Sequence, residues 1–308
     1  MSTALRIGTR GSPLALAQAH ETRDRLAAAH PDLAAPDAIE IVVIKTTGDR
    51  ILDRTLAEAG GKGLFTKELE EALADGRVDL AVHSMKDVPT WLPDGMALAS
   101  LLPREDPRDA FFSRGGHGLD DLPAGSVVGT AGLRRQAQVL ERRPDLTVVP
   151  LRGNVQTRLS KLDAGEVDAT LLALAGLRRL GLTERITAVL EPDVMLPAVA
   201  QGAIGIETRS ADDRTRAYVA ALNCPATATR VTAERALLAA LDGSCRTPIA
   251  ALARLDGDAL TLEAKVLSPD GRRVFRAGRA GTAAEAAAMG ADAGAEIKAQ
   301  LPPDFFRT

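Results

Sequence analysis

The chain has 308 residues, 45% of them hydrophobic and 26% charged, which predicts a soluble globular protein of two or three domains. With a net charge of −3 and only 3% aromatic residues it resembles neither a basic nucleic-acid binder nor a base-stacking platform. No stretch approaches the roughly 18 apolar residues of a membrane span, and no basic start precedes an apolar run at the N-terminus. We therefore expect a cytoplasmic monomer with neither a nucleic acid nor a membrane as partner.

The first half of the sequence alternates short apolar strands with helices. LRIGTR predicts a strand, after which Ser12 is a suitable N-cap and Pro13 a suitable first-turn residue for a helix. IEIVVIKT predicts a second strand, and FTKELEEALADGRVDLAVHSM predicts a helix, a stop at Gly76 and a third strand. This alternation favours crossover connections around a largely parallel sheet.

The middle of the chain repeats this pattern. AGEVDATL resembles DGRVDLAV, so that Gly165 and Asp168 repeat the spacing of Gly76 and Asp79. We expect two similar α/β domains, with crossings near Pro103 and Pro197 and with IGIETR returning as a strand to the first domain. The expected domains are residues 1–102 with 199–221 for the first, and residues 103–198 for the second.

The last part, residues 222–308, has a different pattern. PIAALARL, ALTLEAKVL and RRVFRAGR are strand-like and are separated by two Asp-Gly pairs, which are strong hairpin signals. An Ala-rich helix is expected from about Thr282 to Gln300. The fold class is therefore two similar α/β domains plus a small C-terminal α+β domain with three antiparallel strands and a covering helix.

Arginines follow several of the predicted strands. Arg134 and Arg135 begin a helix, where cations are unfavourable unless an anion is bound. Ligands of parallel α/β sheets bind beyond the carboxyl ends of the strands, where Arg10, Arg152 and Arg158 are also expected. Any one of these arginines could be solvated surface. As a set they favour a bound carboxylate or phosphate.

Three further features of the sequence bear on the chemistry. Lys86 and Asp87 follow an apolar strand and suit acid–base chemistry, although a surface ion pair would look the same. GGKGLFTKE lacks the order of a phosphate-binding P-loop and suggests a glycine-rich flap. The four histidines show no metal-ligand spacing, so we expect no metal.

The two cysteines have different settings. Cys245 lies in GSCRTP, whose turn residues and arginine favour an exposed sulfur with thiolate character, although burial is the commoner fate of a free cysteine. Cys224 has no such setting and is read as structural. A disulfide between them is disfavoured in a cytoplasmic protein.

A family resemblance rests on many ordered motifs between Leu5 and about Ala250. The chain resembles the porphobilinogen deaminases, also called hydroxymethylbilane synthases, in IGTRGSPLALAQA, GGKGLFTKELE, AVHSMKDVP, REDPRDAF, GTAGLRRQAQ, ERRPDL, LRGNVQTRLSKLD, LALAGLRRLGL, LPAVAQGAIGIE, VTAERA and GSCRTPIA.

The resemblance implies two lobes like those of periplasmic solute-binding proteins and a third domain. It implies a dipyrromethane cofactor joined by a thioether to Cys245. Four porphobilinogen units are added to this cofactor with loss of ammonia, and water then releases the product. The implied pathway is the biosynthesis of haem and other tetrapyrroles. Asp87 matches the catalytic aspartate. The implied cofactor contacts are Lys86, Thr130, Arg134, Arg135, Asn154 and Arg158, and the implied substrate contacts are Arg10, Ser12, Phe65, Arg152 and Arg179.

The chain departs from many relatives at Ala131 and Gly132, where those carry serines, and at Glu58, where some carry lysine. Two alternatives remain open from the residues themselves. One is a two-lobed anion receptor without a covalent group, which would leave Cys245 unexplained. The other is an aldolase-like enzyme that forms a Schiff base on Lys86, which would leave the arginines unexplained.

Overall fold

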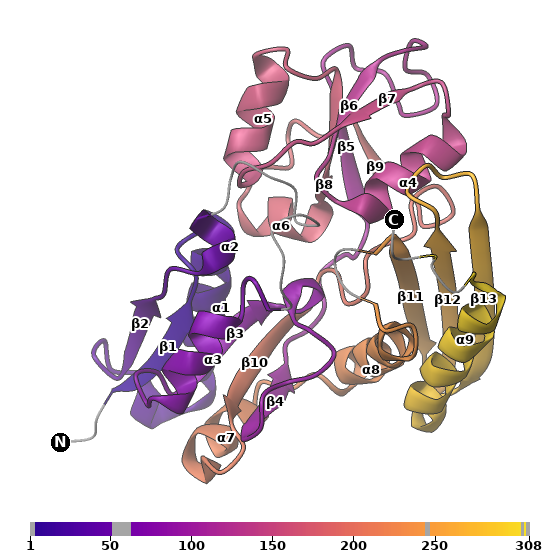
Figure 1. Cartoon of the computed structure of the whole chain (residues 1–308). Helices are drawn as coiled ribbons and strands as arrows, with labels where there is room; N and C mark the ends of the chain where they lie inside the picture. The colour runs from indigo at the N-terminus through magenta and orange to yellow at the C-terminus, as the bar shows by residue number, and fades with distance from the viewer. Residues whose placement is uncertain (1–3, 51–62, 244–246, 303–304, 306–308) are drawn as a thin grey trace. The chain divides into compact units, whose positions relative to one another are not determined.

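A computed structural model describes residues 4–50, 63–243, 247–302 and 305. Their chain contacts divide into two compact units (Figure 1). Unit 1 contains residues 4–50, 63–105 and 203–228, and unit 2 contains the described residues of 106–202 and 229–305. Cys245 and Glu58 lie outside the described residues.

Unit 1 contains a five-stranded sheet in the order β2-β1-β3-β10-β4. Strands β1, β2 and β3 are parallel, whereas β10 runs antiparallel to both of its neighbours. IGIETR therefore returns to the first sheet, as predicted. The strands are β1 (Leu5–Thr9), β2 (Ile39–Val43), β3 (Leu80–Ser84), β4 (Met96–Leu101) and β10 (Ile204–Arg209), and the helices are α1 (Pro13–Ala29), α2 (Thr47–Arg50), α3 (Lys67–Ala74) and α7 (Asp213–Ala220).

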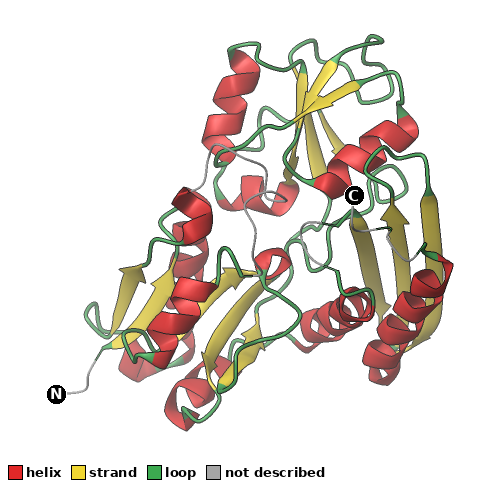
Figure 2. Cartoon of the chain, in the orientation of Figure 1, coloured by secondary structure: helices red, strands yellow, loops and turns green. Residues whose placement is uncertain are grey.

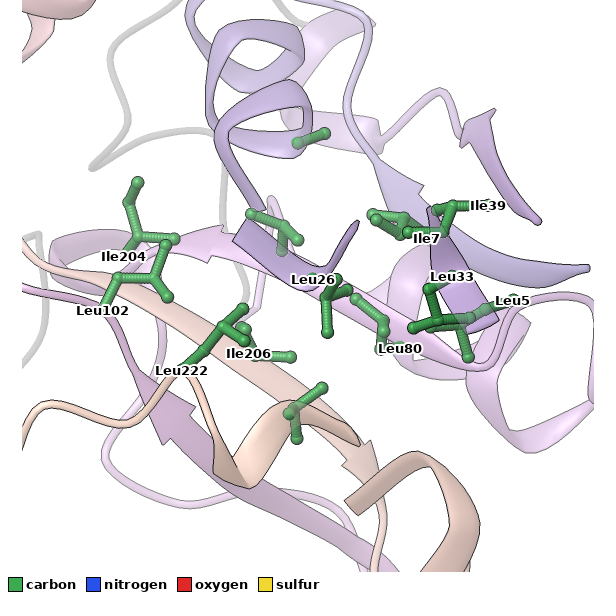
Figure 3. Close-up of a cluster of buried hydrophobic side chains, with 13 residues drawn as sticks. Leu5, Ile7, Leu26, Leu33, Ile39, Leu80, Leu102, Ile204, Ile206 and Leu222 are labelled. Carbon is green, nitrogen blue, oxygen red and sulfur yellow. The ribbon is translucent and has the colours of Figure 1, made fainter. Parts of the chain in front are cut away.

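Helix α1 begins as the sequence predicts. The Ser12 hydroxyl accepts a hydrogen bond from the Ala15 N–H at 3.3 Å, and Pro13 occupies the first turn, where a missing N–H costs nothing. The helix buries Leu26 in an apolar cluster that includes Ile7 of β1 and Leu80 of β3 (Figure 3). A second cluster joins α3 to the same sheet. This packing fixes the edge of the sheet at which the candidate residues lie.

Unit 2 contains a second five-stranded sheet with the same pattern, in the order β7-β6-β8-β5-β9. Its strands β6, β7 and β8 are parallel, and β5 runs antiparallel to β8. The elements are β5 (Asp109–Ser113), β6 (Val127–Gly129), β7 (Thr147–Val149), β8 (Ala169–Ala173) and β9 (Ala188–Leu190), with helices α4 (Leu133–Arg142), α5 (Val155–Asp163) and α6 (Leu174–Arg179).

The repeated DGRVDLAV and AGEVDATL motifs occupy equivalent places in the two sheets. The Asp79 carboxylate accepts the Arg6 N–H of β1, and the Asp168 carboxylate accepts the Val127 N–H of β6, each at 2.8 Å. The glycine before each of them has a positive φ, 68° at Gly76 and 79° at Gly165. The prediction of two similar α/β folds is confirmed.

The C-terminal part forms the predicted three-stranded antiparallel sheet, β11-β12-β13. Both hairpin glycines adopt a positive φ, and helix α9 contacts β12 and β13 (Figure 1). The α-helix starts later than expected, because Thr282 and Glu285 form a capping box around a 3-10 turn. The elements are β11 (Ile249–Asp256), β12 (Ala259–Leu267), β13 (Val274–Thr282), α8 (Pro225–Ala240) and α9 (Ala286–Gln300).

The structure thus has the predicted fold class, with two mixed sheets and one antiparallel sheet (Figure 2). The small sheet shares a compact unit with the second α/β sheet, and the boundaries of the expected three domains stay a prediction. Across the described ranges, none of the helices has the length and apolar character needed to span a bilayer.

Candidate active site

The first group of candidate residues lies at one edge of the unit 1 sheet. Because β1 and β3 are parallel neighbours, Arg10 and Asp87 both follow carboxyl ends at this edge. Lys86 and Asp87 belong to a 3-10 turn, Met85–Asp87, whose Met85 N–H donates to the Ala203 carbonyl at 3.0 Å. Asp87 is partly buried, and its carboxylate has no hydrogen-bond or ion-pair partner within the described ranges. It is therefore available to a ligand.

Arg10 is held from two sides. Its Nε donates to Asp49 at 3.2 Å, its Nη2 forms an ion pair with the same carboxylate, and its guanidinium carbon lies 4.1 Å from the Phe65 ring centroid. Burial would raise the pKa of Asp49, but the hydrogen bonds and charge of Arg10 outweigh it and lower that pKa. Arg10 and Phe65, two predicted substrate contacts, are therefore brought together. Ser12, two residues after Arg10, caps α1 with its oxygen.

The second group lies at the corresponding edge of the unit 2 sheet, around Arg134 and Arg135 in the first turn of α4. Antiparallel β5 begins at this edge, which places Asp109 there, opposite Ala173 of β8. Arg134 Nη2 lies 2.7 Å from Asp109 Oδ2, and Arg135 Nη2 lies 2.7 Å from Oδ1. The anion that the sequence required at this helix start is thus supplied, at least in part, by the protein itself.

Asp109 is a buried residue that the sequence analysis did not identify. Its exposed fraction is 0%, and burial alone would raise its pKa, but Arg134 and Arg135 lower that pKa to about 2. The available signal was an aspartate at the start of the apolar run DAFF, within a motif already quoted for the family resemblance. An ionised residue there requires a partner.

Three predicted contacts lie in the loop after β7 and in the first turns of α5. The Arg152 Nη1 atom is buried and has no hydrogen-bond partner among the described residues. Asn154 caps α5 by accepting the Thr157 N–H at 2.8 Å, which leaves its amide NH₂ group outside that contact. Arg158 Nε donates to the Gly153 carbonyl at 2.9 Å.

The remaining predicted contacts of unit 2 are Thr130 and Arg179. Thr130, which follows β6, is 4% exposed and accepts the Gly132 N–H at 3.3 Å. That contact involves the backbone of Gly132, one of the two positions where many relatives carry serine. Arg179 ends α6 and donates to the Gly202 carbonyl at 3.1 Å.

These residues suit a group that carries several carboxylates. Arg152 gives the strongest support for an anionic ligand, because a buried guanidinium nitrogen without a partner is costly unless an anion completes its hydrogen bonds. The fold and its arginines define an α/β protein suited to small anionic ligands. Similarity to known proteins identifies the family within this class.

Residues 5–217 match the family described as "Porphobilinogen deaminase, dipyromethane cofactor binding domain", and residues 228–299 match "Porphobilinogen deaminase, C-terminal domain". The porphobilinogen deaminase of Paracoccus denitrificans is 60% identical and the alignment covers 98% of this chain and 96% of the relative. The chloroplastic enzyme of Oryza sativa is 59% identical, with 98% and 85% covered. The chain belongs to the porphobilinogen deaminase family.

Among solved structures, the periplasmic aliphatic sulphonate binding protein SsuA from Escherichia coli is 16% identical, with a TM-score of 0.42 and coverage of 78% of this chain and 70% of that one. The family assignment rests on the sequence relatives alone. It confirms the deaminase interpretation over the receptor and the aldolase-like enzyme.

Proposed function

We propose that the chain polymerises four porphobilinogen units head to tail, with loss of ammonia, on a covalently bound dipyrromethane primer, and releases hydroxymethylbilane by hydrolysis. The observation that carries this proposal is the family match over residues 5–217 and 228–299. The free Asp87 carboxylate and the unsatisfied Arg152 nitrogen support it, because the reaction needs an acid–base group and anion-binding groups.

The primer is attached through a thioether to Cys245. The support for this choice is the turn sequence around Cys245 and the contrasting position of Cys224. Cys224 is partly buried in unit 1, and its N–H donates to the Leu101 carbonyl at 2.7 Å, as expected of a structural residue. When bound, the dipyrromethane supplies the pyrrole carbon to which the first substrate unit is joined.

The arginines bind the carboxylate arms of the primer and of the growing chain. Arg134, Arg135 and Arg158, with Lys86, Thr130 and Asn154, contact the primer. Arg10, Arg152 and Arg179, with Ser12 and Phe65, contact the substrate units. The charge-assisted hydrogen bonds of a guanidinium are directional and suit carboxylates in particular.

Asp87 is the catalytic residue. Its carboxylate accepts a hydrogen bond from the substrate's ammonium group, which already carries the proton it needs to leave as ammonia. The same carboxylate stabilises the positive charge that develops on the pyrrole as the C–N bond breaks, and it accepts the proton that the ring finally loses. A carboxylate already in place stabilises this charge more than it stabilises the substrate, which lowers the barrier. We further propose that the protein is cytoplasmic and monomeric.

The experiment that tests this proposal is an intact mass of the purified protein under denaturing conditions. The expected result is a mass above that of the bare chain by one dipyrromethane. Cys245→Ser should give the bare mass, and Cys224→Ala should keep both the adduct and the activity. An adduct that survives denaturation in the Cys245→Ser protein would contradict the attachment site, and a bare parent chain would contradict the covalent primer.

A further inference from the structure

The buried carboxylate of Asp109 is paired with two arginines. Each oxygen of Asp109 lies 2.7 Å from one guanidinium nitrogen, Oδ2 from Arg134 and Oδ1 from Arg135. Asp109 is 0% exposed, and the arginines are 8% and 7% exposed. All three groups are therefore largely removed from water, where their mutual interactions are strong and unpaired charge is costly.

The neutral contacts of this cluster fix its geometry. Arg134 Nη1 donates to the Leu196 carbonyl at 2.8 Å, and Gln201 Nε2 donates to Asp109 Oδ1 at 3.1 Å. Arg135 uses both Nε and Nη2 on Oδ1, at 3.1 and 2.7 Å. Rotation of Arg135 would break two hydrogen bonds, and rotation of Arg134 would break one hydrogen bond and one ion pair.

The charges of the cluster do not balance. Two guanidinium groups carry two positive charges and Asp109 carries one negative charge, and no further acidic side chain within the described ranges forms an ion pair with them. Each guanidinium has five N–H donors, more than its contacts in this cluster use. The cluster thus retains one positive charge and spare donors.

We propose that Asp109 is the resident counter-ion of the two arginines that bind the primer, and that primer carboxylates complete the charge balance that Asp109 begins. Asp109 is a positioning residue in this arrangement, because it acts on the primer through Arg134 and Arg135. Before the primer is assembled it keeps both guanidinium groups buried and oriented. The inference rests on the proposed function of these arginines.

The consequence is a stability effect that depends on the primer. Asp109→Asn keeps the size of the side chain but removes the one acidic group that pairs with the two guanidinium groups among the described residues. A primer-loaded protein has the primer carboxylates to offset this loss, whereas a primer-free protein has nothing. If Asp109 had only a structural role, its replacement would lower the stability of the primer-loaded and the primer-free protein equally.

The test is a thermodynamic cycle that combines Asp109→Asn with Cys245→Ser, which removes the primer, and follows thermal unfolding at neutral pH. We expect Asp109→Asn to lower the unfolding midpoint by about 5–10 °C more in the primer-free background than in the primer-loaded one. The matched control is Asp120→Asn, which removes the partner of Arg142 at the other end of α4, 2.7 Å away and exposed. Its small effect should be equal in both backgrounds.

Equal costs of Asp109→Asn in the two backgrounds would overturn the proposal. Folded protein obtained only in the primer-loaded background would support it. If Asp109→Asn folds in neither, the double variant Asp109→Asn/Arg135→Gln, which again carries one net positive charge, should restore folding of the primer-free protein. Failure of that rescue would also overturn the proposal.

The intact masses of the same samples separate this inference from the proposed function. A parent protein with the mass of its bare chain would contradict the covalent primer itself. A primer that is present while the Asp109→Asn cost is the same in both backgrounds would contradict only the role of Asp109.

Discussion

The guanidinium of Arg10 lies over the ring of Phe65, with 4.1 Å between the guanidinium carbon and the ring centroid. Arg10 also forms an ion pair with Asp49. The neighbouring Gly48 packs closely on the same ring, because a Cβ atom there would lie 2.2 Å from Phe65. A single cation thus organises the loop after β1, the α2 segment and the turn before α3. The aromatic ring serves to orient the arginine.

Phe65→Leu should therefore weaken substrate binding without abolishing it. A cation–π contact that is still partly accessible to water contributes about 0.5–1 kcal/mol, so we expect KM for porphobilinogen to rise about 2–5-fold with little change in kcat. Steady-state kinetics would measure this. Arg214→Leu, which removes the more distant contact to Tyr218 on α7, is the control and should leave KM unchanged. An unaltered KM in Phe65→Leu would show that Arg10 does not depend on the ring.

Replacement of different arginines of the candidate site should have different effects. Arg135→Leu leaves the buried Asp109 with one arginine partner, which should cost about 3–5 kcal/mol of stability and reduce the fraction of protein that carries primer. Arg10→Leu and Arg158→Leu should keep the primer and stall chain extension. Denaturant unfolding and intact mass would show both effects. Primer-loaded Arg135→Leu protein of normal stability would contradict this division.

Asp87→Asn should be the most damaging substitution for catalysis. It removes both the negative charge and the proton transfer, so we expect a rate lower by at least about 10³-fold. Asp87→Glu keeps the charge but displaces it and should retain more activity. Single-turnover mass spectrometry should show all four additions slowed. A defect confined to the final hydrolysis, or near-normal kinetics, would remove Asp87 from the centre of the mechanism.

The ion pairs of Asp109 should make the free energy of unfolding depend on pH in the acid range. Its pKa is lowered from 3.8 to about 2 in the folded state, so its stabilising effect is complete above the unfolded value and is lost as the pH falls through the folded value. This corresponds to about 2 kcal/mol. The difference in unfolding free energy between parent and Asp109→Asn should therefore shrink by more than half between pH 5 and about pH 2.5. A difference independent of pH would contradict the ionised state of Asp109.

Two hairpin glycines of the small sheet provide a matched test of how that sheet packs. Both have a positive φ, 58° at Gly257 and 72° at Gly271. A Cβ atom at Gly257 would meet nothing within 4 Å, whereas at Gly271 it would lie 2.4 Å from the Glu141 nitrogen of α4. Gly257→Ala should cost about 1–2 kcal/mol and Gly271→Ala about 2–5 kcal/mol, measured by urea unfolding. Equal costs would mean that the hairpin does not press on α4.

Much of the fold could be predicted from local patterns. The Ser12 cap, the Asp-Gly hairpins and the repeated Gly-x-x-Asp spacing depend on backbone conformation and on neighbours within a few residues, so the sequence carries them directly. β5 and α8 had no such prediction. β5 is a short apolar run whose pairing with β8 comes from a distant segment, and periodicity does not identify such partners.

For the site, the sequence by itself determined the family, the positions of the arginines at strand ends and the aspartate of the turn after β3. Only the tertiary structure decided what each charged group faces. It paired Arg134 and Arg135 with Asp109 and Arg10 with Asp49, and it left Arg152 Nη1 without a hydrogen-bond partner among the described residues. The physical reason is that an ion pair depends on distance in space and on burial, and both are set by strands that pair across long stretches of the chain.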